Sequence, residues 1–359
     1  MSAFVKQLNM VSAYKENDKL YFSAWNLNGF FECDLKTGHA QLLATLPLVE
    51  GKYGYGSLYK MGNKVFLSPC NGKSIVELNT KDWSDIKTYD IDDAKLGYRV
   101  ARYGSVFEYE RKLFFRPYQA HSVMEFDSET HEIQYHSECY KKLQGIQGIK
   151  DGPLYSGAIR NGSKFWFICT QSNLLISFDM KYRTTEVYRI GDNTEIFSAV
   201  CHDGRDFWIY SRSKKLLRWN ETDGIISIYK DILRSGEEGV SMCYYNGRIW
   251  IATLGLRHCI SVDIVTGKIC DECYIGCKDD TVKYGALKVF DDGLYYLPEH
   301  NDYLYVLNIE EESMKRLKVG LDKENYERYE EAFVKQMLID GSIIQESDVL
   351  SLESFVRCI

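Results

Sequence analysis

Residues 64–79 read Lys-Val-Phe-Leu-Ser-Pro-Cys-Asn-Gly-Lys-Ser-Ile-Val-Glu-Leu-Asn. Two apolar runs are separated here by Pro69-Cys-Asn-Gly72, whose residue types preset or tolerate the backbone angles of tight turns. Asn79 ends the second run, where its side chain can accept hydrogen bonds from backbone N–H groups two or three residues on. With Ser57–Lys60 before it and Ser84–Thr88 after it, this stretch predicts a four-stranded antiparallel meander.

The same pattern recurs along the chain. An apolar run ending in Asp or Asn and followed by a polar turn occurs at seven places: Asp34, Asn79, Asp127, Asp179, Asn220, Asp263 and Asn308. The intervals between them run from 41 to 52 residues, the period of a propeller blade. We therefore predict an all-β fold, a seven-bladed β-propeller of four-stranded antiparallel blades, over residues 1–320. Because the Asp or Asn repeats in every copy, we assign it to turn closure and not to catalysis.

The first strand expected in each copy opens with small residues, as in Ser12-Ala13, Gly56-Ser57 and Gly157-Ala158. Seven strands that converge on one axis leave little room for side chains. The small residues therefore mark the innermost strands of the ring.

Two segments carry a resemblance to known repeats. Tyr245-Asn-Gly-Arg-Ile-Trp-Ile251 resembles the second strand of a kelch repeat, and Val262-Asp-Ile-Val-Thr-Gly267 resembles its third strand and turn. The likeness extends to the related PQQ/YVTN-like propeller repeats and covers roughly residues 9–320. The Gly-Gly doublet that defines kelch repeats is absent, so the resemblance is to kelch-like repeats. It implies a propeller and specifies no activity.

The termini depart from the repeat. Residues 1–8 are expected to add to the last blade. In residues 321–359, Tyr326, Tyr329, Phe333 and Met337 follow helical spacing, and Gly341 is a natural stop. Apolar residues at 349–356 suggest a second amphipathic helix. This helical extension is expected to pack on or beside the ring, although an apolar face presented to a partner is an open alternative.

Bulk properties exclude several functions. The net charge is −7 and the pI about 5.6, whereas nucleic-acid binding normally requires a basic face. The start Met1-Ser-Ala-Phe-Val-Lys6 lacks the pattern of a signal peptide, and no apolar run is long enough to cross a bilayer. The 11 cysteines fall mostly in or beside predicted strands, as buried reduced thiols do. We expect a cytoplasmic protein that contacts neither nucleic acid nor membrane.

A ligand site is expected where loops lead into the innermost strands, because loops on a rigid scaffold usually carry binding. Tyr, Arg and Lys side chains in these loops suit a sugar or an anionic metabolite through stacking and forked hydrogen bonds. The predicted ligand-binding residues are Tyr53, Tyr55, Arg99, Arg102, Tyr103, Tyr155, Lys283 and Tyr284. For the aromatic residues that repeat from blade to blade, packing between blades is the competing interpretation.

Catalytic signals are weak. His300 with Glu299, and separately His121, are the candidates for acid–base chemistry. Because His121 and His300 belong to blades far apart in the ring, we expect no shared metal site. Cys270, Cys273 and Cys277 match no common metal spacing. No phosphate loop, nucleophile elbow or dinucleotide fingerprint occurs, and no cofactor is expected.

Two functions remain open. We favour a non-enzymatic binding or scaffold protein that recognises a protein or a small polar or anionic ligand at the face of the axial funnel. The alternative is a carbohydrate-active enzyme (a lyase, epimerase or hydrolase) or a sugar-binding protein with its site in that funnel. The fold alone supports neither function over the other.

Overall fold

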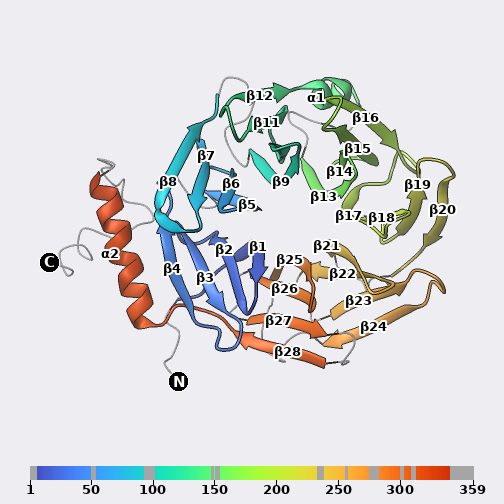
Figure 1. The fold of residues 1–359 in the computed structure, drawn as a ribbon. Coiled ribbons are helices and arrows are strands. Elements are labelled where there is room, and N and C mark those ends of the chain that lie inside the picture. The colour runs from blue at the N-terminus through green and yellow to red at the C-terminus, as the bar shows by residue number, and fades with distance from the viewer. Residues whose placement is uncertain are drawn as a thin grey trace.

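The computed structural model is a closed ring of seven four-stranded antiparallel sheets, which confirms the predicted propeller (Figure 1). It describes residues 6–49, 54–92, 102–146, 149, 154–232, 238–254, 258–274, 283–299, 303–308 and 313–339. In every sheet the four strands are consecutive in the chain, so each blade is one uninterrupted meander.

The strands of the first four blades have these bounds: β1 (Met10–Glu16), β2 (Lys19–Ala24), β3 (Gly29–Asp34) and β4 (Ala40–Thr45); β5 (Tyr55–Met61), β6 (Lys64–Pro69), β7 (Ser74–Asn79) and β8 (Asp82–Asp90); β9 (Tyr103–Tyr109), β10 (Lys112–Pro117), β11 (Val123–Asp127) and β12 (Ile133–His136); β13 (Tyr155–Asn161), β14 (Lys164–Cys169), β15 (Leu174–Asp179) and β16 (Thr184–Arg189). Those of the last three blades are β17 (Phe197–His202), β18 (Phe207–Ser211), β19 (Leu216–Asn220) and β20 (Gly224–Tyr229); β21 (Glu238–Tyr245), β22 (Arg248–Leu254), β23 (His258–Asp263) and β24 (Ile269–Tyr274); β25 (Lys283–Phe290), β26 (Gly293–Glu299), β27 (Tyr303–Asn308) and β28 (Ser313–Lys318). Two helices, α1 (Glu138–Leu143) and α2 (Lys323–Ile339), follow blades three and seven.

Burial follows position within a blade. All residues of β15 are buried, whereas β8 at the outer edge of its blade is mostly exposed. Middle strands are covered on both faces by the neighbouring blades, which explains why their sequences are continuous apolar runs. The core therefore lies between blades: Trp166 of blade four and Phe207 of blade five have ring centroids 4.6 Å apart.

The repeated acids close turns, as predicted. Asp34 Oδ1 accepts hydrogen bonds of 2.8 Å from the backbone N–H groups of both Lys36 and Thr37. Asp263 Oδ1 accepts equivalent bonds from Val265 and Thr266 at 3.0 and 2.7 Å. These bonds to the charged form hold the pKa of each carboxyl below its usual value.

The ring closes without a shared blade. Lys6 forms an antiparallel bridge with Leu321, just beyond β28, and His39 of blade one forms a parallel bridge with Gly320. The expected addition of residues 1–8 to the last blade is thus seen only as this single bridge, since residues 1–5 lie outside the described part of the chain. Gly38, with φ at +79°, lies so close to Lys318 that a Cβ would overlap its carbonyl oxygen.

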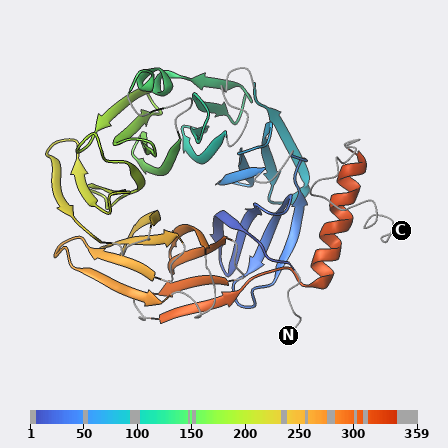
Figure 2. The same cartoon turned by 180° about the vertical axis from the view of Figure 1, so that it is seen from behind.

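Helix α2 lies along the outside of blade one, beside β4, as the two opposite views agree (Figure 1 and Figure 2). Tyr329 is its buried anchor: the ring lies 6.1 Å from that of Phe31, and its hydroxyl accepts a 3.2 Å hydrogen bond from the backbone N–H of Asn28. The second predicted helix, at 349–356, lies outside the described residues.

Candidate functional site

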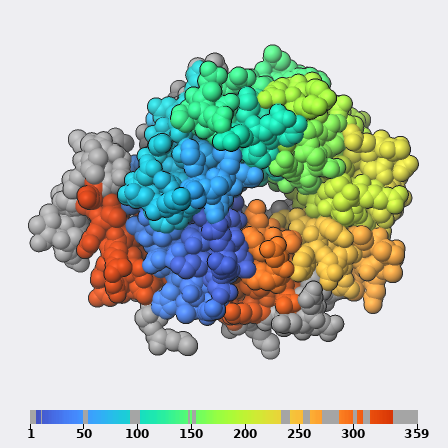
Figure 3. All heavy atoms as spheres, viewed as in Figure 1, coloured from blue at the N-terminus to red at the C-terminus, as the bar shows by residue number. Residues whose placement is uncertain are grey.

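One face of the ring collects two kinds of loop. Tyr103, the first residue of β9, pairs with Pro117, the last residue of β10. The loops that lead into innermost strands and the loops between second and third strands therefore emerge together; we call this side the funnel face. The opposite side, with the remaining turns, is the turn face. The space-filling view shows an opening at the centre of the ring (Figure 3).

The repeated aromatic residues of the funnel face are buried. Tyr55, Tyr103 and Tyr155 are 3%, 0% and 0% exposed, and burial raises the pKa of the Tyr55 hydroxyl to about 12. The backbone at these positions also joins blades, because Tyr155 donates its N–H to the carbonyl of Tyr118 in the preceding blade at 3.0 Å. Packing between blades accounts for their recurrence, and their contact with a ligand stays a prediction.

The other predicted ligand residues divide into three groups. Tyr53, Arg99 and His300 lie outside the described residues. Lys283 and Glu299 are paired across β25 and β26, and Tyr284 is next to Lys283, but only the backbone of these three is described. Arg102 and His121 are described in full, and both belong to blade three.

Arg102 joins blade three to blade two. Its side chain is 3% exposed, and Nη1 donates to the carbonyl oxygens of Asn71, at 3.2 Å, and Gly72. Its backbone N–H donates to the carbonyl of Cys70 at 2.7 Å. These bonds to backbone carbonyls give Arg102 a role in joining the two blades, and its contact with a ligand stays a prediction.

Arg116 is a neighbour that the sequence analysis missed. It is 6% exposed, and its Nη1 donates to the carbonyl oxygens of Pro117 at 2.8 Å and Tyr155 at 2.9 Å. Burial lowers the pKa of this guanidinium to about 10. The available signal was an arginine at the end of the apolar run Leu113-Phe-Phe115.

The loop after Arg116 holds two further polar groups in unusual surroundings. The ring of His121 stacks on that of Tyr140, with centroids 3.7 Å apart. Its Nε2 atom and the Oε1 atom of Gln119 are buried and have no hydrogen-bond partner. Burial lowers the pKa of His121, which favours the neutral imidazole at pH 7.

Buried charges near the turn face are neutralised internally. Glu125, 2% exposed, contacts Lys112 at 2.9 Å, His136 at 2.8 Å and Arg183 at 2.9 Å. Burial alone would raise the pKa of Glu125, but hydrogen bonds from these three partners hold it well below its usual value. Because Arg183 comes from blade four, this cluster joins two blades, and its geometry accounts for its charges without a ligand.

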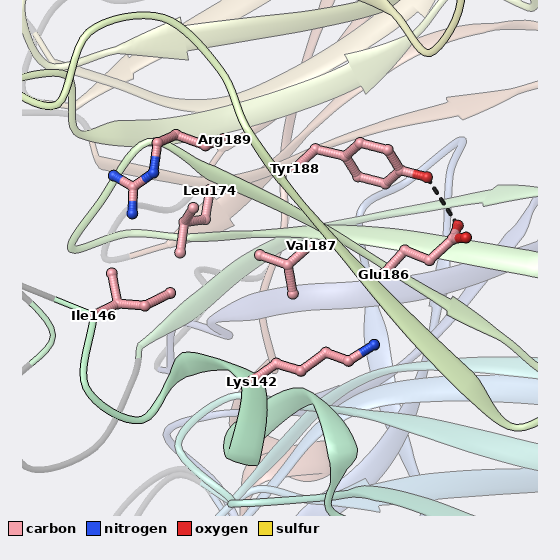
Figure 4. A pocket seen from close by; sticks show the side chains of 7 residues that line it. All are labelled: Lys142, Ile146, Leu174, Glu186, Val187, Tyr188 and Arg189. Carbon is pink, nitrogen blue, oxygen red and sulfur yellow. Dashed lines mark hydrogen bonds between the residues drawn. The ribbon is translucent and has the colours of Figure 1, made fainter.

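A cavity of about 550 Å³ lies at the outer rim, between α1 and β16 (Figure 4). Its polar groups already have partners. Tyr188 donates to Glu186 at 2.8 Å, Lys142 pairs with Glu138 at 2.9 Å, and Arg189 Nη1 contacts Asn193 at 2.9 Å. Since these groups are satisfied within the protein, the cavity is a weaker candidate than the funnel face.

The described residues contain no group of three or more His, Cys, Asp or Glu side chains placed to hold a metal ion. No helix within the described ranges is both long enough and apolar enough to span a membrane.

The fold defines the class of this protein as a seven-bladed β-propeller. Virginiamycin B lyase from Staphylococcus aureus, in a catalytically inactive variant with quinupristin, is similar: TM-score 0.64, 12% identity, 83% of this chain and 94% of that one covered. YCF48 from Cyanidioschyzon merolae matches with TM-score 0.63, 8% identity and coverage of 83% and 95%. BamB from Moraxella catarrhalis matches with TM-score 0.53, 12% identity and coverage of 80% and 79%.

No family model matches the sequence, and no curated protein does. At these identities the structural likenesses show the fold alone, which hosts unrelated functions.

Proposed function

We propose that this protein is a non-enzymatic binding protein that recognises its partner or ligand at the funnel face of blade three. The observation that supports this is a concentration of unsatisfied polar atoms: Arg116 Nε, Gln119 Oε1 and His121 Nε2 are all buried without a hydrogen-bond partner. Such groups are rare because each costs about 1–3 kcal/mol. A binding partner that supplies the missing hydrogen bonds would offset that cost.

Contrast with the turn face strengthens the proposal. Glu125 there is contacted by Lys112, Arg183 and the ring of His136, and Asp206, fully buried, pairs with Arg218 at 2.7 Å. A cluster of unsatisfied polar atoms within one blade is better suited to recognition than charged groups that are already paired within the protein. The proposal does not depend on whether the repeats are kelch-like or PQQ/YVTN-like.

The test is partner capture from the native cell with a matched pair of variants. Tyr118, 41% exposed, lies on the funnel face, and Tyr182, 66% exposed, lies on the turn face. The full chain would be cross-linked in cells and its partners quantified by mass spectrometry, with native mass spectrometry used to detect bound small molecules. A partner or adduct lost in Tyr118→Ser and kept in Tyr182→Ser supports the proposal. Equal recovery in both variants contradicts it.

His121 supports a second candidate, a carbohydrate-active enzyme such as a lyase. A neutral imidazole with an unpartnered nitrogen can take a proton from a substrate. Incubation with a panel of oligosaccharides, followed by mass spectrometry of the products, would reveal turnover. Loss of that turnover in His121→Gln would assign the base, and absence of products from every sugar would leave the binding role.

A cytoplasmic location is part of the proposal. Its support is that several cysteines whose side chains the structure describes are free, including the buried Cys33, Cys139 and Cys169. Reduced thiols persist in a reducing compartment. Fluorescence microscopy of the tagged chain in its own cell would test the location directly.

A further inference from the structure

Among the residues that the structure describes, Arg116 is a buried cation without a neutralising acid. It makes no ion pair within the described part of the chain, and the bonds it donates go to two carbonyl oxygens from its Nη1 atom. Taking an unpaired charge out of water is costly, and buried charges in proteins are normally paired. The buried acids discussed above, Glu125 and Asp206, obey that rule.

A second guanidinium makes the local imbalance larger. Both Arg116 and Arg102 act on Cys70: they lower the pKa of its thiol, although burial dominates and raises it to about 11. The Arg102 backbone N–H bonds the Cys70 carbonyl at 2.7 Å, and Gly104, two residues further along the chain, lies against Arg116. Both cations therefore belong to the junction of blades two and three, and their summed positive potential attracts an anion.

The unused part of the Arg116 guanidinium has the geometry for an oxyanion. With Nη1 engaged by carbonyls, the Nε–Nη2 edge remains, and Nε is buried without a partner. This edge presents two parallel N–H groups, the arrangement that binds a carboxylate or phosphate in a bidentate manner.

Gly104 keeps space beside that edge. It lies in the innermost strand β9, and a Cβ at this position would overlap Arg116 Nη2. Gly56 occupies the matching place in β5, but a Cβ there would meet only ordinary contacts, with Cys70 Cβ at 3.6 Å. The chain thus offers one glycine that is needed for the arginine to hold its position and one matched glycine that is not.

We infer that Arg116, supported by Arg102, binds the anionic group of a small molecule, a carboxylate or a phosphate, at the funnel face between blades two and four. This inference rests on the proposed function, because it names the chemistry recognised by that same face. Charge-assisted bidentate bonds from Arg116 would satisfy its Nε atom and neutralise its charge.

The test uses the full chain and two probes, inorganic phosphate and succinate, against sodium chloride at equal ionic strength. At about 10 mM probe, we expect the unfolding temperature of the wild type to rise by roughly 2 °C or more, since a ligand that binds only the folded state stabilises it. The probe with the larger shift identifies the anion class. Gly56→Ala should keep the shift, whereas Arg116→Met and Gly104→Ala should lose it.

Arg116→Lys keeps the positive charge but loses the two parallel N–H groups, so its unfolding temperature should rise less with the probe than that of the wild type. This variant keeps the test usable if Arg116→Met does not fold. No shift with either probe, or a full shift in every Arg116 and Gly104 variant that folds, overturns the inference. If the anion shift is absent but partner capture still depends on Tyr118, only this inference fails. If the anion shift follows Arg116 while capture is insensitive to Tyr118, the proposed protein recognition fails and the anion site stands.

Discussion

Glu125 on β11 and Arg183 in the turn after β15 form an ion pair across two blades. Arg183 Nη2 lies 2.9 Å from Glu125 Oε1, and its Nε atom lies 3.2 Å from Oε2, so the contact is bidentate. The two residues are 58 positions apart in the chain. Neighbouring blades are therefore joined by directed polar contacts as well as by apolar packing.

Replacing Glu125 with Gln should destabilise the protein by about 3 kcal/mol, because it removes the buried acid that pairs with the half-buried Lys112 and Arg183. The pKa of Glu125 is lower in the folded protein than in the unfolded chain, where it is about 4.3. Its stabilisation is thus complete above about pH 5 and is lost as the pH falls through the unfolded value toward the folded one.

Urea unfolding at several pH values would check both statements. The difference between wild type and Glu125→Gln should shrink as the solution becomes more acidic. Glu129→Gln is the control, since Glu129 pairs with Arg111 but is 61% exposed, and it should cost less than about 1 kcal/mol. A cost independent of pH would contradict the assigned role of the ionised carboxylate.

Gly38→Ala should weaken closure of the ring. A left-handed φ costs an alanine about 1–2 kcal/mol, and the overlap with the Lys318 carbonyl adds a packing cost of about 1–3 kcal/mol. Gly62, with φ at +59° and nothing within 4 Å of an added Cβ, provides the control for the backbone term alone. Hydrogen exchange should accelerate at the amides of Ala40 and Gly320 in Gly38→Ala and stay unchanged in Gly62→Ala. Equal exchange rates in the two variants would contradict the role of Gly38 in closing the ring.

Trp166→Ala should be among the most destabilising single changes. Its indole is 1% exposed and packs between the rings of Phe207 and Tyr188, with centroids 4.6 and 5.4 Å away. Truncating a buried tryptophan costs about 3–5 kcal/mol through lost burial and a residual cavity. Chemical denaturation should show this loss, while the exposed Tyr182→Ala should remain within about 0.5 kcal/mol of wild type.

The strands and turns were predictable because their determinants are local. Asp34 and the backbone N–H groups it accepts from are three residues apart or fewer, so a short window of sequence contains the whole interaction. Periodicity then set the number of blades, since the pattern repeats at the period of one sheet.

The candidate site was less predictable because its contacts cross blades. Arg116 reaches the carbonyl of Tyr155, 39 positions away, and no local pattern distinguishes that arginine from an exposed one. The role of the aromatic residues at the start of the innermost strands was also ambiguous in the sequence. Their recurrence fitted both packing and ligand contact; the burial of Tyr103 and Tyr155 between blades accounts for it by packing, and ligand contact stays a prediction.

Because each blade is a single continuous stretch, the chain crosses from one sheet to the next only once per junction. Lys6 and Leu321 are already hydrogen-bonded to each other at the seam. A short linker from Leu321 to Lys6, with residues 322–359 removed, and a cut at any other junction would yield a circular permutant that keeps all seven sheets. The fold of this ring therefore depends on the order of the blades around the axis and not on the blade at which the chain starts.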